Sequence, residues 1–119
     1  MEKYFINLTN HPSAKWDINQ IKEAEKYGKI IDIPFPTVDS SGDEKYIREL
    51  CNVTFDKIME YKPEAVLCQG EFTLVYQLVR RLKECNITVL AACSQRNVIE
   101  HGNKKEVIFE FTQFRKYEN

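Results

Sequence analysis

The chain has 119 residues, of which 43% are hydrophobic and 29% are charged, an ordinary composition for one soluble globular domain. Its 17 basic and 18 acidic residues give a net charge of −1, which excludes the general electrostatic footprint of a protein that binds long DNA or RNA. No apolar run approaches the roughly 20 residues that cross a bilayer, and the start MEKYFINL lacks a signal-peptide layout, so we expect a cytoplasmic protein with no membrane contact.

Strand-like and helix-like segments alternate in the first half of the chain. Asp17 and Gln20 have the spacing of a capping box, in which each residue satisfies an otherwise unpaired amide at a helix start. Gly28 is suited to the left-handed residue that ends a helix. The expected elements are a strand over 3–8, a helix from 17 to 28, a strand over 29–33, and a helix that opens at 40–43 and ends before Pro63.

The alternation continues in the second half. After a third strand over 65–68, Val75, Leu78, Val79 and Leu82 recur at helical spacing and predict an amphipathic helix. The apolar segment 87–93 is typical of a central parallel strand. Segments 96–101 and 106–114 flank the turn GNKK and predict an antiparallel hairpin at the sheet edge.

This order of elements predicts an α/β fold, a three-layer Rossmann-like sandwich with a mostly parallel sheet and a C-terminal antiparallel β-hairpin. We expect a single domain over residues 1–119. Right-handed crossovers place the second strand on one side of the first, and the third and fourth strands on the other. Open sheets of this kind bind ligands outside the carboxyl ends of the strands where the winding reverses.

Polar residues follow three strands at the predicted point of reversal. Because the carboxyl ends of parallel strands share one edge of a sheet, these residues are expected to meet in a ligand-binding cleft. They are Thr9, Asn10 and His11 after the first strand, Gln69, Gly70 and Glu71 after the third, and Ser94, Gln95 and Arg96 after the fourth.

Each of these residues also has a purely structural interpretation, and both stay open. Gly70 permits either a tight turn or a close approach of ligand to backbone. Glu71 and Thr73 either complement the dipole of the following helix or contact a ligand such as a ribose hydroxyl. His11 is either incidental or an acid–base group. Arg96 either anchors its loop to a carboxylate such as Glu71 or binds phosphate.

The sequence predicts neither a metal nor a cofactor. The four cysteines, Cys51, Cys68, Cys85 and Cys93, have no CxxC spacing and lie in apolar segments, so we expect buried, reduced thiols. There is no GxGxxG and no GxxxxGK[ST] motif, which disfavours a standard dinucleotide or nucleoside triphosphate site.

Taken together, four motifs resemble those of the small stand-alone ring nucleases with a CARF-like Rossmann fold that accompany type III CRISPR systems. The motifs are the strand ending in Asn10–His11, the segment QGEFT at 69–73, the strand ending in Ser94–Arg96, and the closing FEFTQFRKY. The resemblance spans nearly the whole chain. It implies a homodimer that binds cyclic oligoadenylate, such as cyclic tetra-adenylate, and cleaves it without a metal, with both sites facing one ring.

By the same resemblance, the pocket would be lined by Asn10, His11, Gln69, Gly70, Glu71, Phe72, Thr73, Ser94 and Arg96, and Arg115 and Tyr117 also match the pattern. We expect the ribose 2′-hydroxyl to attack its own phosphate, with His11 and Arg96 as catalytic residues, His11 moving a proton and Arg96 and helix-start amides stabilising phosphoryl charge. Two alternatives stay open: a non-catalytic nucleotide-binding module, and an interaction subunit whose hairpin docks on a partner.

Overall fold

The structure, a computed structural model, describes residues 2–119. Its elements follow the predicted alternation closely. The strands are β1 (Tyr4–Leu8), β2 (Lys29–Asp32), β3 (Ala65–Cys68), β4 (Thr88–His101) and β5 (Lys104–Lys116). The helices are α1 (Ile18–Glu25), α2 (Glu44–Met59) and α3 (Phe72–Glu84), with a short 3-10 turn at Ser13–Lys15.

The strands form one five-stranded sheet in the order β2-β1-β3-β4-β5. The first four strands are parallel, and β5 runs antiparallel to β4 at the edge. The chain therefore leaves β1 toward β2 on one side and returns to β3 on the other. This confirms the predicted α/β class, the mostly parallel sheet and the reversal of winding between β1 and β3.

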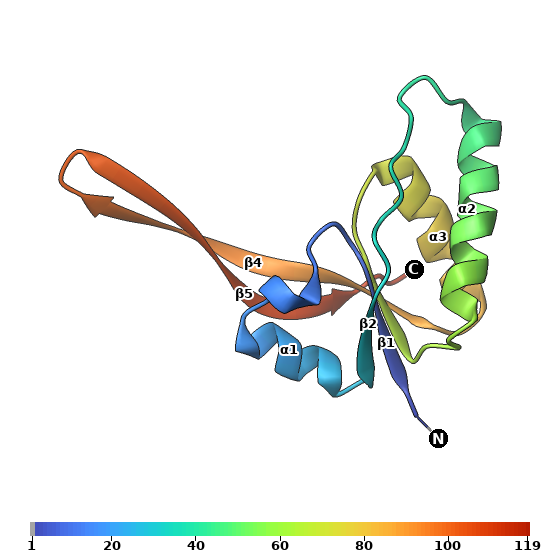
Figure 1. The fold of residues 1–119 in the computed structure, drawn as a ribbon, viewed down its shortest axis with the longest axis horizontal. Coiled ribbons are helices and arrows are strands. Elements are labelled where there is room, and N and C mark those ends of the chain that lie inside the picture. Colours follow the sequence, from blue (N-terminus) through green and yellow to red (C-terminus); the bar gives the residue numbers. More distant parts are fainter. Residues whose placement is uncertain (1) are drawn as a thin grey trace.

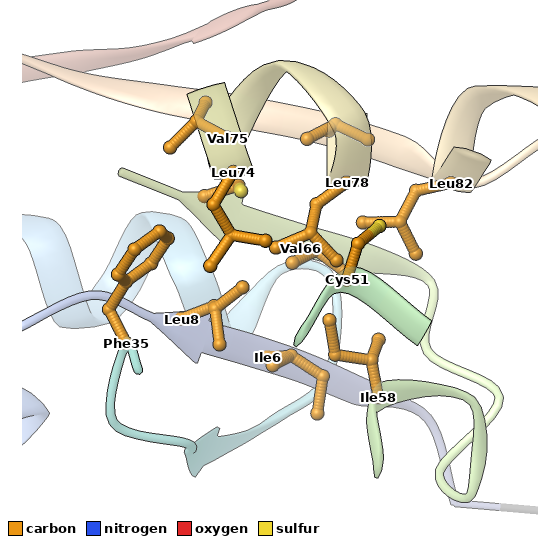
Figure 2. Close-up of a cluster of buried hydrophobic side chains, with 12 residues drawn as sticks. Ile6, Leu8, Phe35, Cys51, Ile58, Val66, Leu74, Val75, Leu78 and Leu82 are labelled. Carbon is orange, nitrogen blue, oxygen red and sulfur yellow. The ribbon is translucent and has the colours of Figure 1, made fainter. Parts of the chain in front are cut away.

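Helices cover both faces of the sheet (Figure 1). Successive strand residues point to opposite faces, so Ile6 and Leu8 of β1 join one core cluster while Phe5 joins another. The first cluster packs under α2 and α3, and Figure 2 shows Ile6 and Leu8 there beside side chains of both helices. The second, smaller cluster packs under α1 with partly buried Trp16.

Each helix begins at an acidic residue that accepts hydrogen bonds from the first turn. Asp17 accepts from the amide of Gln20, which is one of the two bonds of the predicted capping box, and Asp43 accepts from the amide of Tyr46. Such side chains satisfy amides that have no partner within the helix. Across residues 2–119, none of the helices combines the length and apolar character needed to cross a membrane.

The main difference from the predicted fold lies in β4. It does not end at Cys93 but runs on to His101, with a register shift between Cys93 and Ser94. The register places the extra residue on β5, where Thr112 opposes no residue of β4. Such a bulge bends the paired strands locally, and pairing resumes beyond it. Outside the body of the sheet, β4 and β5 continue as a two-stranded ribbon, called the arm here and comprising residues 94–111 (Figure 1).

Candidate functional site

A cleft of about 630 Å³ opens at the carboxyl ends of β1 and β3 and beside the middle of β4, on the face of the sheet that carries α1. It lies where the topology places a ligand site, at the reversal between β1 and β3. Five of the residues predicted from the sequence line it: Thr9, Asn10, His11, Gln69 and Ser94. The remaining lining residues are Pro12, Lys15, Trp16, Asp17, Gln20, Leu67, Ala92, Phe109 and Phe111.

The loop that carries His11 is fixed by a buried asparagine. Asn7 is 1% exposed, and its Nδ2 donates to Oδ1 of Asp32 at 2.8 Å and to the His11 carbonyl at 3.0 Å. Its Oδ1 accepts from the Thr9 hydroxyl at 2.8 Å, and the same hydroxyl accepts from the His11 amide at 3.1 Å. Because both backbone groups of His11 are held, its exposed side chain is presented from a fixed position.

The same loop is tied to β2 and to the sheet below. Asp32 accepts from the amide and the hydroxyl of Ser13, at 3.2 and 2.9 Å. The indole Nε1 of Trp16 donates to the His11 carbonyl at 3.1 Å. These contacts fix the conformation of the loop that carries His11 and Lys15. A loop that is already ordered loses less conformational entropy when a ligand binds.

Gln69 joins β3 to β4 where their own ladder ends. Its Oε1 accepts from the Ala92 amide at 2.8 Å, and its backbone amide donates to the Leu8 carbonyl at 3.2 Å. Since the carbonyl oxygen of the side chain is used in this way, the Nε2 hydrogens are the part of the amide left to serve a ligand. Gln69 thus has both a structural contact and a position in the cleft.

Aromatic rings form the apolar side of the cleft. Trp16 packs edge-on against Phe5 and Phe114, with ring centroids 6.3 and 6.4 Å apart. Phe111 packs edge-on against Phe114 at 4.9 Å. Phe109, further out on the arm, is 66% exposed. An exposed ring beside polar donors is the arrangement that stacks nucleobases in single-strand-binding sites.

Of the two interpretations of Glu71 and Thr73, the structure shows the capping contact at the start of α3. The Glu71 carboxylate accepts from the amides of Thr73 and Leu74, at 2.8 and 3.0 Å, and from the Thr73 hydroxyl at 2.7 Å. The hydrogen bonds from Thr73, first its amide and then its hydroxyl, hold the pKa of Glu71 below its ordinary value. The amides of Thr73 and Leu74 are therefore already capped by a carboxylate, which disfavours phosphate binding by these two groups.

The presence of glycine at position 70 is explained by packing. A Cβ at this position would lie 2.5 Å from ring carbons of Phe35, a core residue that is 5% exposed. Neither Gly70 nor Glu71 lines the cleft. Phe72 is 88% exposed and, with Thr73, borders a separate hollow beside Asp43 and Tyr76.

Of the three polar residues expected to follow the fourth strand, only Ser94 lines the cleft. All three lie within β4, because the strand continues to His101. Alternation along a strand sends Gln95 to the face opposite Ser94, and Arg96 to the same face but further from the body. Across residues 2–119, Arg96 makes no ion pair with Glu71. The proposed anchor to that carboxylate is therefore absent from the described part of the chain.

The two C-terminal residues that match the family pattern lie away from the cleft. Tyr117 donates its hydroxyl to the Cys68 carbonyl at 3.2 Å, and its amide donates to the Val89 carbonyl at 2.9 Å. Burial, and then the neighbouring Cys68, raise the pKa of Tyr117. This residue fastens the end of the chain over β3 and β4. Arg115 is exposed and pairs with Ala91 in the β4–β5 ladder.

The cysteines are free thiols, as predicted, but they differ in burial. Cys51 and Cys68 are buried, Cys93 is half-buried and Cys85 is exposed, so the expectation of burial fails for Cys85. Burial raises the pKa of Cys68 to about 12. Within residues 2–119, no group of three or more His, Cys, Asp or Glu side chains gathers in a way that could hold a metal ion.

The sequence analysis missed Lys15, Trp16, Phe109 and Phe111. Trp16 is the only tryptophan of the chain. A tryptophan in a polar turn could have indicated a binding site from the sequence alone. Lys15 gives the cleft its only lysine, and Asp17 is the only acidic residue of the lining. The two phenylalanines alternate along the closing strand, but a strand pattern alone does not show that they pass a cleft.

Comparison with protein families gives one match, and a comparison with curated proteins gives none. The matching model is described as the uncharacterized protein MJ1673 family and covers residues 3–115. That span includes all the elements of the sheet except the last residue of β5. The chain belongs to the uncharacterized protein MJ1673 family.

Proposed function

We propose that this protein is a ring nuclease that binds cyclic oligoadenylate in the cleft and opens it without a metal. The observation that carries the proposal is the meeting of His11, Lys15 and Gln69 with the rings of Trp16 and Phe109 around one cleft. The proposal also rests on the resemblance of the motifs to stand-alone ring nucleases. It includes the finer fold assignment, a Rossmann-like domain of the CARF type.

The lining has the groups that an adenylate needs. Aromatic faces stack purine bases, and such stacking contributes roughly 1–3 kcal/mol per base. The Lys15 ammonium supplies a positive charge for phosphate. Gln69 Nε2 and the Asn10 amide supply hydrogen-bond donors and acceptors for a base edge or a ribose. With one lysine and one aspartate, the lining has no excess positive charge, so we expect stacking and hydrogen bonds to supply most of the affinity and an extended polyanion to be disfavoured.

Chemistry in this cleft would be a transesterification within the ring. The 2′-oxygen of one ribose bonds to the adjacent phosphorus, and the bond from that phosphorus to the 5′-oxygen of the next nucleotide breaks. His11 takes the proton of the 2′-hydroxyl, and the leaving 5′-oxygen receives a proton from water. The products are linear oligoadenylates with a 2′,3′-cyclic phosphate at one end and a 5′-hydroxyl at the other.

Two effects account for the acceleration. Holding the 2′-oxygen in line with the leaving oxygen removes much of the entropic barrier. General-base assistance by a positioned histidine typically contributes about 10²–10⁴ in rate. Lys15 takes the charge-stabilising role that the sequence analysis gave to Arg96 and to the start of α3, because Lys15 lines the cleft and those groups do not.

A second copy of the chain would complete the site. Pockets of about 300–1,000 Å³ hold one drug-sized ligand, and this cleft of about 630 Å³ falls within that range. A ring of four nucleotides is several times larger than such a ligand. We therefore propose a homodimer in which part of the bound ring contacts the partner copy.

The test is incubation with cyclic tri-, tetra- and hexa-adenylate, with and without a chelator, followed by chromatography and mass analysis of the products. His11→Ala is expected to lower kcat by about 10²–10⁴, while Lys15→Ala raises KM more than it lowers kcat. Lys26→Ala, just beyond the far end of α1, is the matched control, since Lys26 does not line the cleft.

The outcomes separate the proposal from its alternatives. Ring opening that survives the chelator and is lost in His11→Ala supports it. Tight binding with every ring recovered intact indicates a non-catalytic nucleotide-binding module. A ligand at 100 times its Kd stabilises a fold by about 2.7 kcal/mol. If no ring is bound, cleaved or able to raise the thermal stability of the protein, the proposed ligand site does not exist.

A further inference from the structure

The arm formed by residues 94–111 has no layer of the protein over it. A two-stranded ribbon is at best marginally stable in water unless it packs against something. One face of this ribbon carries three exposed apolar side chains: Phe109 is 66% exposed, Val98 46% and Val107 43%. Exposed apolar side chains gathered on one face are typical of a surface that meets a partner.

The register of the arm shows which side chains share that face. Directly opposed residues of an antiparallel pair point to the same side. The pairs are Arg96 with Phe109, Val98 with Val107, and Glu100 with Lys105, from the body toward the tip. Within the last pair, Lys105 Nζ lies 3.9 Å from Glu100 Oε1. The cleft residues Ser94 and Phe111, also an opposed pair, lie next to the body on the same face.

We propose that this face is a homodimer interface in which the arms of two copies pack face to face and antiparallel. The two-fold axis passes at the level of Val98 and Val107, where each valine meets its own copy. That axis sets Arg96 over Glu100 of the second copy, and Phe109 over Lys105 of the second copy. The first contact is an ion pair, and the second is a cation–π pair. The pattern is therefore self-complementary, as an isologous interface must be.

The opposite face of the arm does not have this property. It carries the pairs Gln95 with Glu110, Asn97 with Ile108, and Ile99 with Glu106. An axis at the level of Asn97 would set Glu110 over Glu106 of the second copy, and an axis at Ile99 would set Glu106 over itself. Both arrangements bring like charges together, which is destabilising. The charges thus select one face and one register.

The partner also reaches the cleft in this arrangement. With the axis at Val98 and Val107, the turn residues Gly102 and Asn103 of the second copy lie over Ser94 and Phe111, which line the cleft. The tip of the partner's arm thus borders the site, and it is the part of the partner copy that a bound ring would contact. The interface is inferred from the arm surface and does not depend on the proposed activity.

The interface is small, so the dimer is expected to be concentration-dependent. Eight residues of extended strand span roughly 27 Å, and two such ribbons face to face bury on the order of 600 Å² in total. This is below the roughly 1,200–2,000 Å² of stable specific interfaces and is the size of a weak, transient contact. We expect dissociation in the micromolar range. In so small an interface, each ion pair between the two copies is expected to contribute measurably to the free energy of association.

The experiment is a charge swap measured by sedimentation over a protein concentration series. Arg96→Glu and Glu100→Arg, each alone, place like charges across the axis twice per dimer and are expected to weaken association about tenfold or more. The double variant Arg96→Glu with Glu100→Arg restores both ion pairs and is expected to return to within about threefold of wild type. Residues 96 and 100 lie roughly 13 Å apart along one strand, so the restored pairs cannot be intramolecular.

Glu106→Arg, on the opposite face, is the matched control and is expected to keep the wild-type association. Circular dichroism of each variant checks that it is folded. A wild-type chain that stays monomeric throughout the series overturns the proposal, as does a dimer that is insensitive to the single swaps. A folded double variant that associates as weakly as the two single variants also overturns it.

Discussion

Substitution of Gly70, in the turn between β3 and α3, tests whether a glycine is required there because a side chain would clash with the core. Replacing Gly70 with alanine would put a Cβ 2.5 Å from the ring carbons Cγ, Cδ1 and Cε1 of Phe35. Ordinary contacts of a Cβ lie at 3.4–4 Å, so the ring has to move by about 1 Å. Phe35 is only 5% exposed and belongs to the core cluster under α2 and α3 (Figure 2).

The magnitude follows from two opposing effects. Overpacking of a core costs about 1–3 kcal/mol, and replacing a glycine that has no left-handed conformation returns about 0.4–1 kcal/mol through the unfolded chain. We expect Gly70→Ala to lower the free energy of unfolding by about 1–2 kcal/mol. For a domain of 119 residues, that corresponds to a fall in Tm of roughly 3–10 °C.

Urea unfolding followed by circular dichroism measures this change, and the Phe35→Leu background supplies the control. If the clash is with the ring, the cost of Gly70→Ala is expected to shrink by about 1 kcal/mol when Phe35 is leucine. A Gly70→Ala protein as stable as wild type, or an equal cost in both backgrounds, would refute the packing explanation of this glycine.

Three further predictions concern single groups. Glu71→Ala removes the cap of α3 and is expected to lower the free energy of unfolding by about 1 kcal/mol. Because folding lowers the pKa of Glu71, wild type is expected to be more stable than Glu71→Gln at neutral pH. This difference disappears as acid protonates the carboxyl group in the folded state. Asn7→Leu removes one donor each from the Asp32 carboxylate and the His11 carbonyl, which keep their bonds from Ser13 and Trp16. It also removes the Asn7 acceptor of the Thr9 hydroxyl, so chemical unfolding is expected to show a loss of about 1–3 kcal/mol. Burial raises the pKa of Cys68 from 9.0 to about 12, so on raising the pH the unfolded state loses this proton before the folded state does. The free energy of unfolding is therefore expected to fall above pH 9, by about 1 kcal/mol between pH 9 and 10. A Cys68→Ala protein with the same alkaline slope as wild type would contradict that assignment.

Local signals were sufficient to predict most of the body of the protein. Asp17 and Asp43 precede helices that both begin within a residue of them. The spacing of Val75, Leu78 and Leu82 gave α3, and all three are buried. With the strands in their predicted order, the rule for open sheets placed the cleft correctly at the ends of β1 and β3.

The hairpin around GNKK was predicted, and the structure confirms it as the paired ends of β4 and β5. Its continuity with the fourth strand was not predicted, because the residues that join them do not face a core. Ser94, Gln95 and Arg96 interrupt the apolar pattern of segment 87–93, and such an interruption indicates a loop when a strand is assumed to be buried. The structure shows a bulge at Cys93 and Ser94 followed by an exposed ribbon, where polar side chains on both faces are tolerated. This is why Arg96 lies on the arm.

The direction of individual side chains was also beyond the sequence. Glu71 follows β3 as predicted, but its carboxylate turns back to the amides of Thr73 and Leu74. Nothing in the spacing distinguishes a capping carboxylate from one that contacts a ligand, since both sit one residue before a helix. Conversely, Trp16 and Lys15 reach the cleft because the network around Asn7 folds their loop over it.

The account depends most on the cleft as the place where cyclic oligoadenylate binds, and Trp16 reports on it directly. It is the only tryptophan of the chain and it lines the cleft, so its fluorescence, excited at the red edge of its absorption, can be titrated with cyclic tetra-adenylate using the His11→Ala protein. We predict a saturable change in emission that weakens in a Lys15→Ala background and persists in a Lys26→Ala background. Emission that stays unchanged while the ring binds by another measure, or a ring that does not bind at all, would contradict the assignment of the cleft.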